Sequence, residues 1–273
     1  MSDDKLKLGV MVYAAEDPAE PINRVREVGV PSCQVGWPPF GTVEHGQRVR
    51  AAADAAGVEI TTLWAGLPGR TVWNFLQGPI TIGLVPPEWR QIRVQALEAA
   101  ALVAAEIGVH SITTHVGFLP EYAHDPLFLG TLEGLRQVAG TCASHGVSFW
   151  FETGQETPTT LLRTIQMIGT ENLGINLDPA NLLLYGKANP CDAVDVFGEW
   201  VRGVHAKDGE YPTGGDSLGE EKPLGQGRVN FPVLVPKLKA KGFRGALTIE
   251  REISGPQQVA DIKSAIELLT PLL

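Results

Sequence analysis

The chain has 273 residues, of which 44% are hydrophobic and 19% are charged, a balance typical of a globular protein with a large core. Its formal net charge of −9 argues against a surface that binds nucleic acid or an anionic membrane, since both attract basic patches. The three cysteines are widely spaced and form no CxxC pair, so we expect no disulfide framework. The sequence starts without a signal-peptide pattern and has no apolar run long enough for a membrane span. These features predict a cytoplasmic protein.

Eight short runs are apolar or rich in β-forming residues and lie close to turn residues, which predicts strands. In chain order these runs are 6–13, 32–37, 59–65, 111–117, 148–153, 173–178, 201–207 and 246–252.

Amphipathic stretches rich in Ala, Leu, Glu, Arg and Gln lie between these runs and predict helices. In chain order they are 21–29, 43–57, 87–107, 126–145, 157–169, 190–200, 232–242 and 255–272. The clearest is 87–107, which has Pro87 in its first turn and Gly108 just beyond its end, the expected start and stop residues of a helix.

Strand and helix thus alternate about eight times, a pattern that indicates parallel strands joined by crossover helices. At this length, eight units favour a single (β/α)₈ TIM barrel over residues 1–273. No GxGxxG motif follows the first strand, which weakens a dinucleotide-binding alternative. Two long Gly- and Pro-rich connections, 66–86 and 209–228, follow strands, so we expect them on the carboxyl face of the barrel as lids or walls of a substrate site.

The ends of the last four predicted strands carry side chains that can bind a metal. FETG contains Glu152, NLDPANL contains Asp178, VHAKD contains His205 and TIERE contains Glu250. In a barrel the active site forms where strands run into their βα loops, so four adjacent strands can direct these side chains to one point.

Three carboxylates and one imidazole make a hard, oxygen-rich ligand set, which suits Mn²⁺, Mg²⁺ or Co²⁺ better than a metal that prefers thiolates. Without a cation, three carboxylates would repel one another in a partly buried site. Each residue alone also fits a structural role, as a helix cap, a loop ion pair or a core histidine. The combination on four successive strands predicts a metal centre, with Mn²⁺ the expected ion.

The phrases FETG, LDPANL, VHAKD, PLGQGRVNF and TIERE resemble the sugar phosphate isomerase/epimerase superfamily of xylose-isomerase-like barrels, and the likeness covers nearly the whole chain. It is closest to the branch with ketose 3-epimerases, hydroxypyruvate isomerase and inosose-processing enzymes. The resemblance implies a metal held by Glu152, Asp178, His205 and Glu250. It also implies that Glu152 and Glu250 are a catalytic acid–base pair that act through a cis-enediolate on a small keto-sugar. Dimers and tetramers are common among similar proteins, so the resemblance leaves both a homodimer and a homotetramer open for this chain.

One position departs from this branch and affects the expected chemistry. Ketose 3-epimerases usually have a His three residues after the metal-binding Asp, whereas this chain has Asn181 there. Asn181 can still donate a hydrogen bond to a substrate oxygen, but it cannot change its charge.

Other side chains near the strand ends are candidates for substrate contact, each with a structural alternative. His115 and Glu156 can bind sugar hydroxyls, or serve as a structural histidine and a favourable charge at a helix start. Lys207 can neutralise an enediolate or a substrate carboxylate.

The ends of strands two, three and eight add further candidates. Trp37 and Trp64 can stack on a sugar or simply pack at the barrel mouth, and Arg251 can reach a substrate acid or pair with a carboxylate in the barrel wall.

Four functions share this sequence pattern. The first is a metal-dependent isomerase or epimerase of a ketose or keto-sugar, and the second is a lyase or dehydratase that eliminates from a keto-sugar, keto-inositol or dehydroshikimate at the same site. An endonuclease for abasic DNA would need a histidine-rich three-metal cluster, which six histidines and a charge of −9 disfavour. A barrel that binds sugar without catalysis is disfavoured by the intact ligand set.

Overall fold

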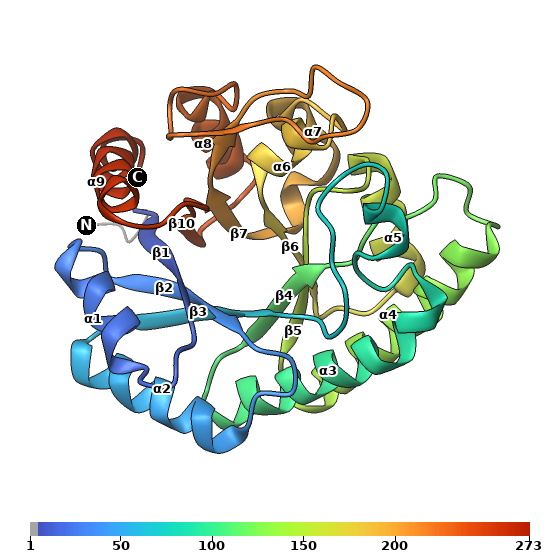
Figure 1. Cartoon of the computed structure of the whole chain (residues 1–273), viewed down its shortest axis with the longest axis horizontal. Coiled ribbons are helices and arrows are strands. Elements are labelled where there is room, and N and C mark those ends of the chain that lie inside the picture. The colour runs from blue at the N-terminus through green and yellow to red at the C-terminus, as the bar shows by residue number, and fades with distance from the viewer. Residues whose placement is uncertain (1–4) are drawn as a thin grey trace.

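Eight parallel strands close into a barrel in the computed structural model, which describes residues 5–273 (Figure 1). Around the barrel the strands follow the order β1, β10, β7, β6, β5, β4, β3, β2. Their bounds are β1 Lys7–Tyr13, β2 Ser32–Trp37, β3 Glu59–Ala65, β4 Ser111–His115, β5 Ser148–Glu152, β6 Leu173–Leu177, β7 Val201–Ala206 and β10 Ala246–Ile249. The predicted TIM barrel is thereby confirmed.

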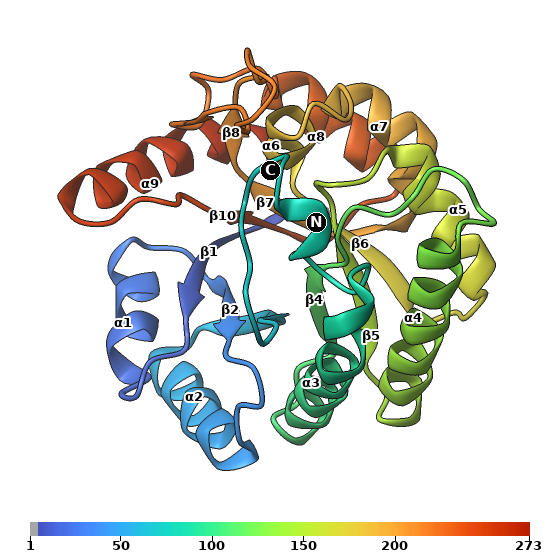
Figure 2. The ribbon, with the colours of Figure 1, turned by 45° about the vertical axis from the view of Figure 1, so that its right-hand side comes forward.

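A helix follows each of these strands, and the helices form a ring outside the barrel (Figure 2). They are α1 Ala19–Glu27, α2 Val43–Ala56, α3 Pro87–Glu106, α4 Pro126–Ser144, α5 Pro158–Ile168, α7 Pro190–Phe197, α8 Phe231–Ala240 and α9 Pro256–Leu269. Local sequence explains the boundaries of α2. Thr42 caps its start, because the Thr42 hydroxyl accepts a hydrogen bond from the His45 amide, and the left-handed Gly57 follows its last residue. Among the described residues, no helix combines the length and apolarity needed to cross a bilayer.

Several short elements were not predicted from the sequence. α6 (Pro179–Leu184) begins directly after β6, and a small antiparallel pair joins β8 (Asp208–Gly209) to β9 (Glu221–Lys222). The 3₁₀ turn η1 (Gly78–Ile80) was not predicted either, whereas η2 (Gly198–Trp200) and η3 (Thr270–Leu272) are turns at the ends of the predicted helices 190–200 and 255–272. The unpredicted strands and η1 have two or three residues each and α6 has fewer than two helical turns, too short to show a period in sequence.

The barrel interior carries buried polar side chains at the level of the carboxyl ends of the strands. Gln34 and Asn176, on opposite sides of the barrel, meet in its interior, where Gln34 Nε2 donates to Asn176 Oδ1 at 2.9 Å. Buried amides need hydrogen-bonding partners, so this polar layer marks where the interior changes from packing to a functional site.

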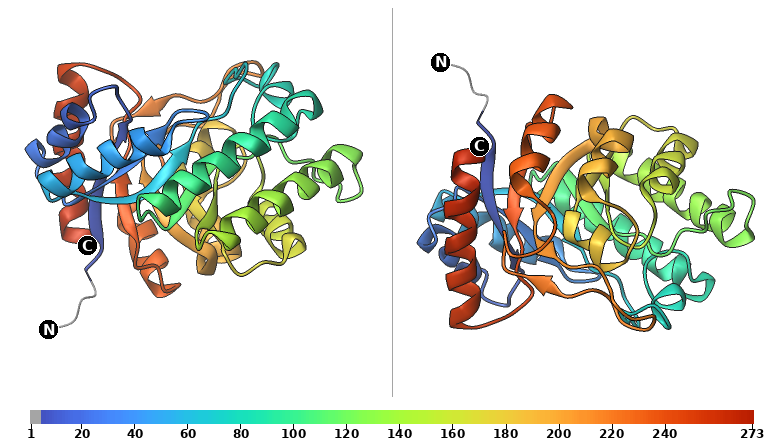
Figure 3. Two further views of the ribbon diagram at one scale, coloured as in Figure 1. Left: turned by 90° about the horizontal axis from the view of Figure 1, so that it is seen from below. Right: turned by 90° about the horizontal axis from the view of Figure 1, so that it is seen from above.

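The two long connections lie on the carboxyl side of the barrel, as predicted, and they touch. The amide of Phe75 in the 66–86 segment donates to the carbonyl of Asp216 in the 209–228 segment, at 3.3 Å. Both views of Figure 3 show the cyan and orange segments meeting beside the barrel. Residues far apart in sequence thus form one wall next to the strand ends.

Candidate metal centre and active site

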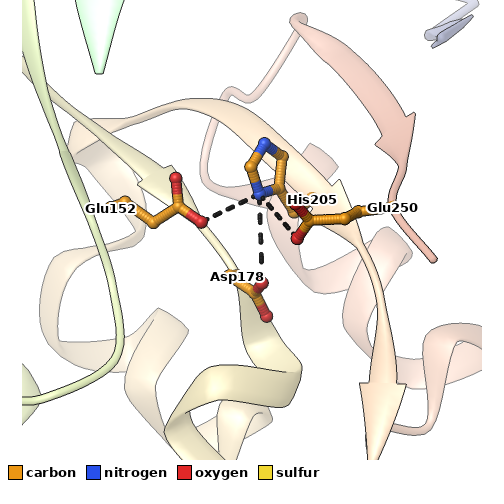
Figure 4. A group of neighbouring side chains, drawn as sticks. All are labelled: Glu152, Asp178, His205 and Glu250. Atoms are coloured by element: carbon orange, nitrogen blue, oxygen red, sulfur yellow. Dashed lines mark ion pairs between the residues drawn. The ribbon is translucent and has the colours of Figure 1, made fainter. Parts of the chain in front are cut away.

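The four predicted ligands converge on one buried point. Glu152 is the last residue of β5, Asp178 follows β6, His205 lies in β7 and Glu250 follows β10. One ligand atom from each lies within 4.8 Å of the others, and all four residues are buried. Figure 4 shows the three carboxylates directed at the same nitrogen of His205.

The distances centre on Nδ1 of His205. Glu152 Oε1 lies 2.9 Å from this nitrogen, Glu250 Oε2 lies 3.3 Å from it and Asp178 Oδ2 lies 3.9 Å from it. His205 Nδ1 and Asp178 Oδ2 are buried atoms without a hydrogen-bond partner. Buried polar atoms are nearly always satisfied, so two orphans that face each other fit a ligand that the protein chain does not supply. Three carboxylate oxygens and one imidazole nitrogen are the donor set for a hard divalent cation.

The cluster of three buried carboxylates also favours the binding of a cation. Burial raises the pKa of Asp178 to about 8, and the neighbouring Glu250 adds to the shift although Lys207 opposes it. Burial alone would lower the pKa of His205, but Glu152 and Glu250 outweigh it and hold that pKa well above its ordinary value. In the metal-free protein, protons on these groups therefore balance the clustered carboxylates.

Two of the three carboxylates, Glu152 and Asp178, have one oxygen held by the protein and one directed at the centre. Glu152 Oε2 accepts from Trp64 Nε1 at 2.6 Å and from Asn176 Nδ2 at 3.4 Å, while its Oε1 faces His205. Asp178 Oδ1 accepts from the Asn181 amide at 2.8 Å and caps α6, while its Oδ2 faces the centre. Such outer contacts fix the orientation of metal ligands.

The histidine ligand is held in the same way, by a residue that sequence reasoning missed. Gln34 of β2 places its Oε1 2.8 Å from His205 Nε2, on the side of the ring away from the carboxylates. The only sequence signal is a large polar side chain among mostly small and apolar residues: Gln34 in SCQVGW and, in the same way, Asn176 in LGINL.

A cavity of about 340 Å³ opens above the centre. Its walls carry carboxylates, aromatic rings and two leucines, namely Tyr13, Trp64, Trp73, His115, Glu152, Asn181, Leu184, Tyr185, Leu218, Glu250 and Glu252. A cavity of this kind, with a few convergent polar groups among apolar walls, is typical of a small-molecule site.

Three of the predicted substrate residues line this cavity. They are His115, Asn181 and Trp64, and His115 Nε2 lies 3.7 Å from Glu152 Oε1. Lys207 lies directly behind the wall, where its ammonium is 3.3 Å from Glu250 Oε2 and 2.8 Å from Glu252 Oε1.

Three other predicted substrate residues do not line the cavity. Trp37 packs against His45 at the start of α2, with ring centroids 5.2 Å apart. Arg251 forms ion pairs with Glu221 at 3.0 Å and Asp261 at 2.7 Å, which is the barrel-wall role that the sequence left open. Both residues thus make the packing and ion-pair contacts that the sequence analysis gave as their structural alternatives.

Glu156, the third, is buried and neither of its carboxylate oxygens has a hydrogen-bond partner. Burial raises its pKa to about 8. It lies outside the lining of the cavity, and its contact with a sugar hydroxyl stays a prediction.

Sequence reasoning also missed cavity residues that lie outside the strand-end motifs. Trp73 comes from the long 66–86 segment and sets its ring 5.3 Å from that of His115. Tyr185 follows α6, and Leu218 comes from the 209–228 segment. The prediction that both long segments form walls of the site was the only signal for Trp73 and Leu218, and it did not extend to Tyr185.

A model of the xylose isomerase-like TIM barrel family matches residues 22–272. The chain belongs to this family. The xylose isomerase-like barrel of a xylose isomerase domain protein from Planctomyces limnophilus is 36% identical to it, over 98% of this chain and 97% of that one, with a TM-score of 0.91. The uncharacterized protein MJ1311 of Methanocaldococcus jannaschii is 27% identical over 177 residues, which are 60% of this chain and 58% of that protein. The chain thus spans less than two thirds of that relative's length.

Two more distant xylose isomerase-like barrels share the fold alone. The 3-keto-D-glucoside 4-epimerase YcjR from E. coli is 18% identical, with a TM-score of 0.73 over 98% of this chain and 100% of that one. The probable 3-DHS dehydratase AsbF from Bacillus anthracis is 16% identical, with a TM-score of 0.67 over 96% of this chain and 99% of that one.

Proposed function

We propose that this protein is a divalent-metal-dependent isomerase or epimerase of a ketose or keto-sugar. The observation that carries the proposal is the placement of Glu152 and Glu250. Both belong to the buried ligand set, both line the cavity, and they approach His205 from two sides (Figure 4). Two carboxylates at one bound carbon are what proton removal and return require.

A carbon next to a carbonyl gives up a proton only if the resulting enediolate is stabilised. A divalent cation, when bound by the four ligands, would supply the positive charge for that stabilisation. Glu152 can then accept a proton through Oε1, since Trp64 and Asn176 occupy its other oxygen. In epimerisation one glutamate removes the proton from one face and the other, in its protonated form, returns a proton to the opposite face.

Mn²⁺ is the ion we propose, with Mg²⁺ or Co²⁺ as substitutes. Three carboxylates favour hard cations, while the single imidazole favours a transition ion over Ca²⁺. We propose that His115, Asn181 and Trp64 contact the substrate, because they line the cavity around the two glutamates. Lys207 acts from behind Glu250 by holding its carboxylate in place.

A lyase is the second candidate, because a third titratable side chain lies beside the glutamates. His115 is 3.7 Å from Glu152 and lines the cavity, where its ring can hydrogen-bond to the hydroxyl that would depart. Proton removal next to the carbonyl would be shared with the first candidate, and elimination from a keto-sugar, keto-inositol or dehydroshikimate would follow. The fold shared with a probable 3-DHS dehydratase supports keeping this reaction.

Deuterium exchange tests both candidates. Protein stripped with EDTA and reloaded with Mn²⁺ would be incubated in D₂O with a panel of free and phosphorylated ketoses, and the products followed by NMR. We expect deuterium next to the carbonyl of at least one ketose, no exchange with EDTA and recovery on addition of Mn²⁺. A new ultraviolet absorbance would indicate elimination instead of epimerisation. No exchange with any ketose in the Mn²⁺-loaded protein would contradict the proposal.

A further inference from the structure

Two buried amide side chains connect two of the metal ligands through the barrel interior. Gln34 Oε1 lies 2.8 Å from His205 Nε2, and Gln34 Nε2 donates to Asn176 Oδ1 at 2.9 Å. Asn176 Nδ2 in turn donates to Glu152 Oε2 at 3.4 Å. Gln34 and Asn176 are almost completely buried, so the three contacts have no competition from bulk solvent. We call Gln34 and Asn176 the amide pair.

The donor and acceptor of each of these three hydrogen bonds follow from the carboxylate of Glu152. An ionised carboxylate only accepts, so the nitrogen of the Asn176 amide must face Glu152 and its oxygen must face Gln34. That oxygen requires a donor, so the nitrogen of Gln34 faces Asn176 and its oxygen faces His205. The nitrogen of His205 beside this oxygen must therefore carry a hydrogen.

The hydrogen on Nε2 determines the state of Nδ1, the other ring nitrogen of His205. A neutral imidazole has one N–H and one free lone pair, so a hydrogen on Nε2 leaves the lone pair on Nδ1. Nδ1 is the nitrogen that faces Glu152, Glu250 and Asp178, and it has no hydrogen-bond partner. With both amides reversed, Gln34 would donate to Nε2, Nδ1 would carry the hydrogen and an amide oxygen would oppose Glu152.

We propose that the amide pair sets the tautomer of the neutral His205 ring, with the hydrogen on Nε2 and the lone pair of Nδ1 directed at the metal. Gln34 and Asn176 are positioning residues: they reach the centre only through His205 and Glu152. The inference rests on the proposed function because it requires a metal at this centre. Contacts of this type usually change metal affinity by about 10–100-fold.

The affinity test compares three barrel-interior variants. Gln34→Leu removes the acceptor for His205, and Gln34→Glu keeps an acceptor there. Thr62→Val is the matched control, because Thr62 pairs with Gln34 in the neighbouring strand and loses one buried hydrogen bond, to the Ser111 carbonyl, without touching a metal ligand. Dissociation constants for Mn²⁺ would be measured by EPR of the free ion, with thermal unfolding recorded for each variant.

We expect Gln34→Leu to weaken Mn²⁺ binding by about 10–100-fold. Gln34→Glu should recover most of this loss, and Thr62→Val should lower the unfolding temperature without changing the affinity. Wild-type affinity in Gln34→Leu would overturn the inference and leave the proposed function standing. A wild-type protein that binds no divalent ion would overturn both, so the two failures are distinguishable.

A second measurement needs no substitution. In ¹⁵N-histidine-labelled wild-type protein loaded with diamagnetic Cd²⁺, long-range ¹H–¹⁵N spectra identify which ring nitrogen carries a hydrogen. We expect a proton on Nε2 of His205 and the metal on Nδ1. A metal on Nε2, or a proton on Nδ1 in the loaded protein, would overturn the inference whatever the variants show.

Discussion

Three of the four candidate metal ligands are positioned in the same way by a neighbouring residue. In each of three ligands a neighbour holds one polar atom, so that the other is directed at the centre. The indole of Trp64 holds Glu152, the amide of Asn181 holds Asp178, and Gln34 holds His205. Side chains fixed in this way lose little freedom when a ligand binds, which favours both affinity and geometry.

The first prediction concerns the Trp64 donor. Trp64→Phe keeps an aromatic ring in the cavity wall but removes the N–H that reaches Glu152 Oε2 at 2.6 Å. A hydrogen bond to a charged group contributes about 1.5–3 kcal/mol, so we expect the rate of deuterium exchange to fall by about 10–100-fold. Trp73→Phe is the control, since it changes an aromatic residue of the same cavity. Equal rates in the two variants would contradict a specific role for the Trp64 donor.

The second prediction concerns Glu156, whose pKa burial raises to about 8 from an ordinary value of 4.5. A raised folded-state pKa stabilises the protein fully below pH 4.5, and that stability is lost as pH rises through about 8. Glu156→Gln has no proton to lose, so its unfolding temperature relative to wild type should rise steadily between pH 6 and pH 9. Thermal unfolding across this range measures the difference.

The same variant separates the two interpretations of Glu156. Because Glu156 does not line the cavity, Glu156→Gln should leave the KM for the ketose unchanged. An increase in KM together with a flat pH profile would favour the substrate contact expected from the sequence.

At the scale of elements, one aspartate organises the connection after β7. Asp208 Oδ1 accepts from the amides of Gly209 and Val229 at 2.8 and 3.0 Å, and Oδ2 accepts from those of Gly225 and Gly227 at 2.9 and 3.1 Å. A charged acceptor that satisfies four amides holds both ends of the 209–228 segment together.

We therefore predict that Asp208→Ala destabilises the protein by about 2–4 kcal/mol, because it leaves buried amides without a partner. The 209–228 segment, which supplies Leu218 to the cavity, should also become sensitive to protease and the KM should rise. Urea unfolding and limited proteolysis measure the two effects. Loss of stability without new cleavage in 209–228 would show that the segment is held by other contacts.

The 66–86 segment depends on a close approach of two backbones. Gly83 has a φ of +71°, and a Cβ there would overlap the backbone of Val116 just beyond β4. Gly83→Ala should therefore destabilise the protein by more than about 2 kcal/mol. Gly140→Ala in α4 is the control: it has open space and should stabilise the helix by about 0.5–1 kcal/mol. Chemical denaturation of both variants gives the comparison, and a neutral Gly83→Ala would contradict the close approach.

At the scale of the whole molecule, strands from both sides of the barrel complete one centre. The ligands come from β5, β6, β7 and β10 or the residues just after them, while Gln34 reaches His205 from β2 across the interior. The barrel thereby brings three carboxylates together at one buried point. When no cation is bound, protons on the groups of the site balance their negative charge.

This balance gives the last prediction. The pKa values of His205 and Asp178 are raised, so the metal-free folded protein holds protons that the unfolded chain has lost, and its stability falls as pH rises above 6. Mn²⁺ competes with those protons and binds more tightly as pH rises. The increase in unfolding temperature caused by Mn²⁺ over EDTA should therefore grow between pH 6 and pH 8.5. A constant or absent increase would contradict a metal at this centre.

Both the barrel and the group of candidate metal ligands could be predicted from the sequence. Local patterns were sufficient for this: apolar runs and turn residues gave the eight strands, and the motifs around Glu152, Asp178, His205 and Glu250 gave the ligands at the strand ends. Parallel strands bring their carboxyl ends to one edge, so the convergence of those residues follows from the fold class.

Only the tertiary structure decided which neighbours of the ligands serve the site. Trp37 and Trp64 both stand near strand ends, yet Trp37 packs against α2 while Trp64 faces the cavity and donates to Glu152. Gln34 in turn reaches His205 only because the closed barrel brings β2 opposite β7. Strands buried on both faces show no alternation of polar and apolar residues, so sequence does not reveal which side chains point inward. The closure of the barrel and the packing of its helices fix that choice.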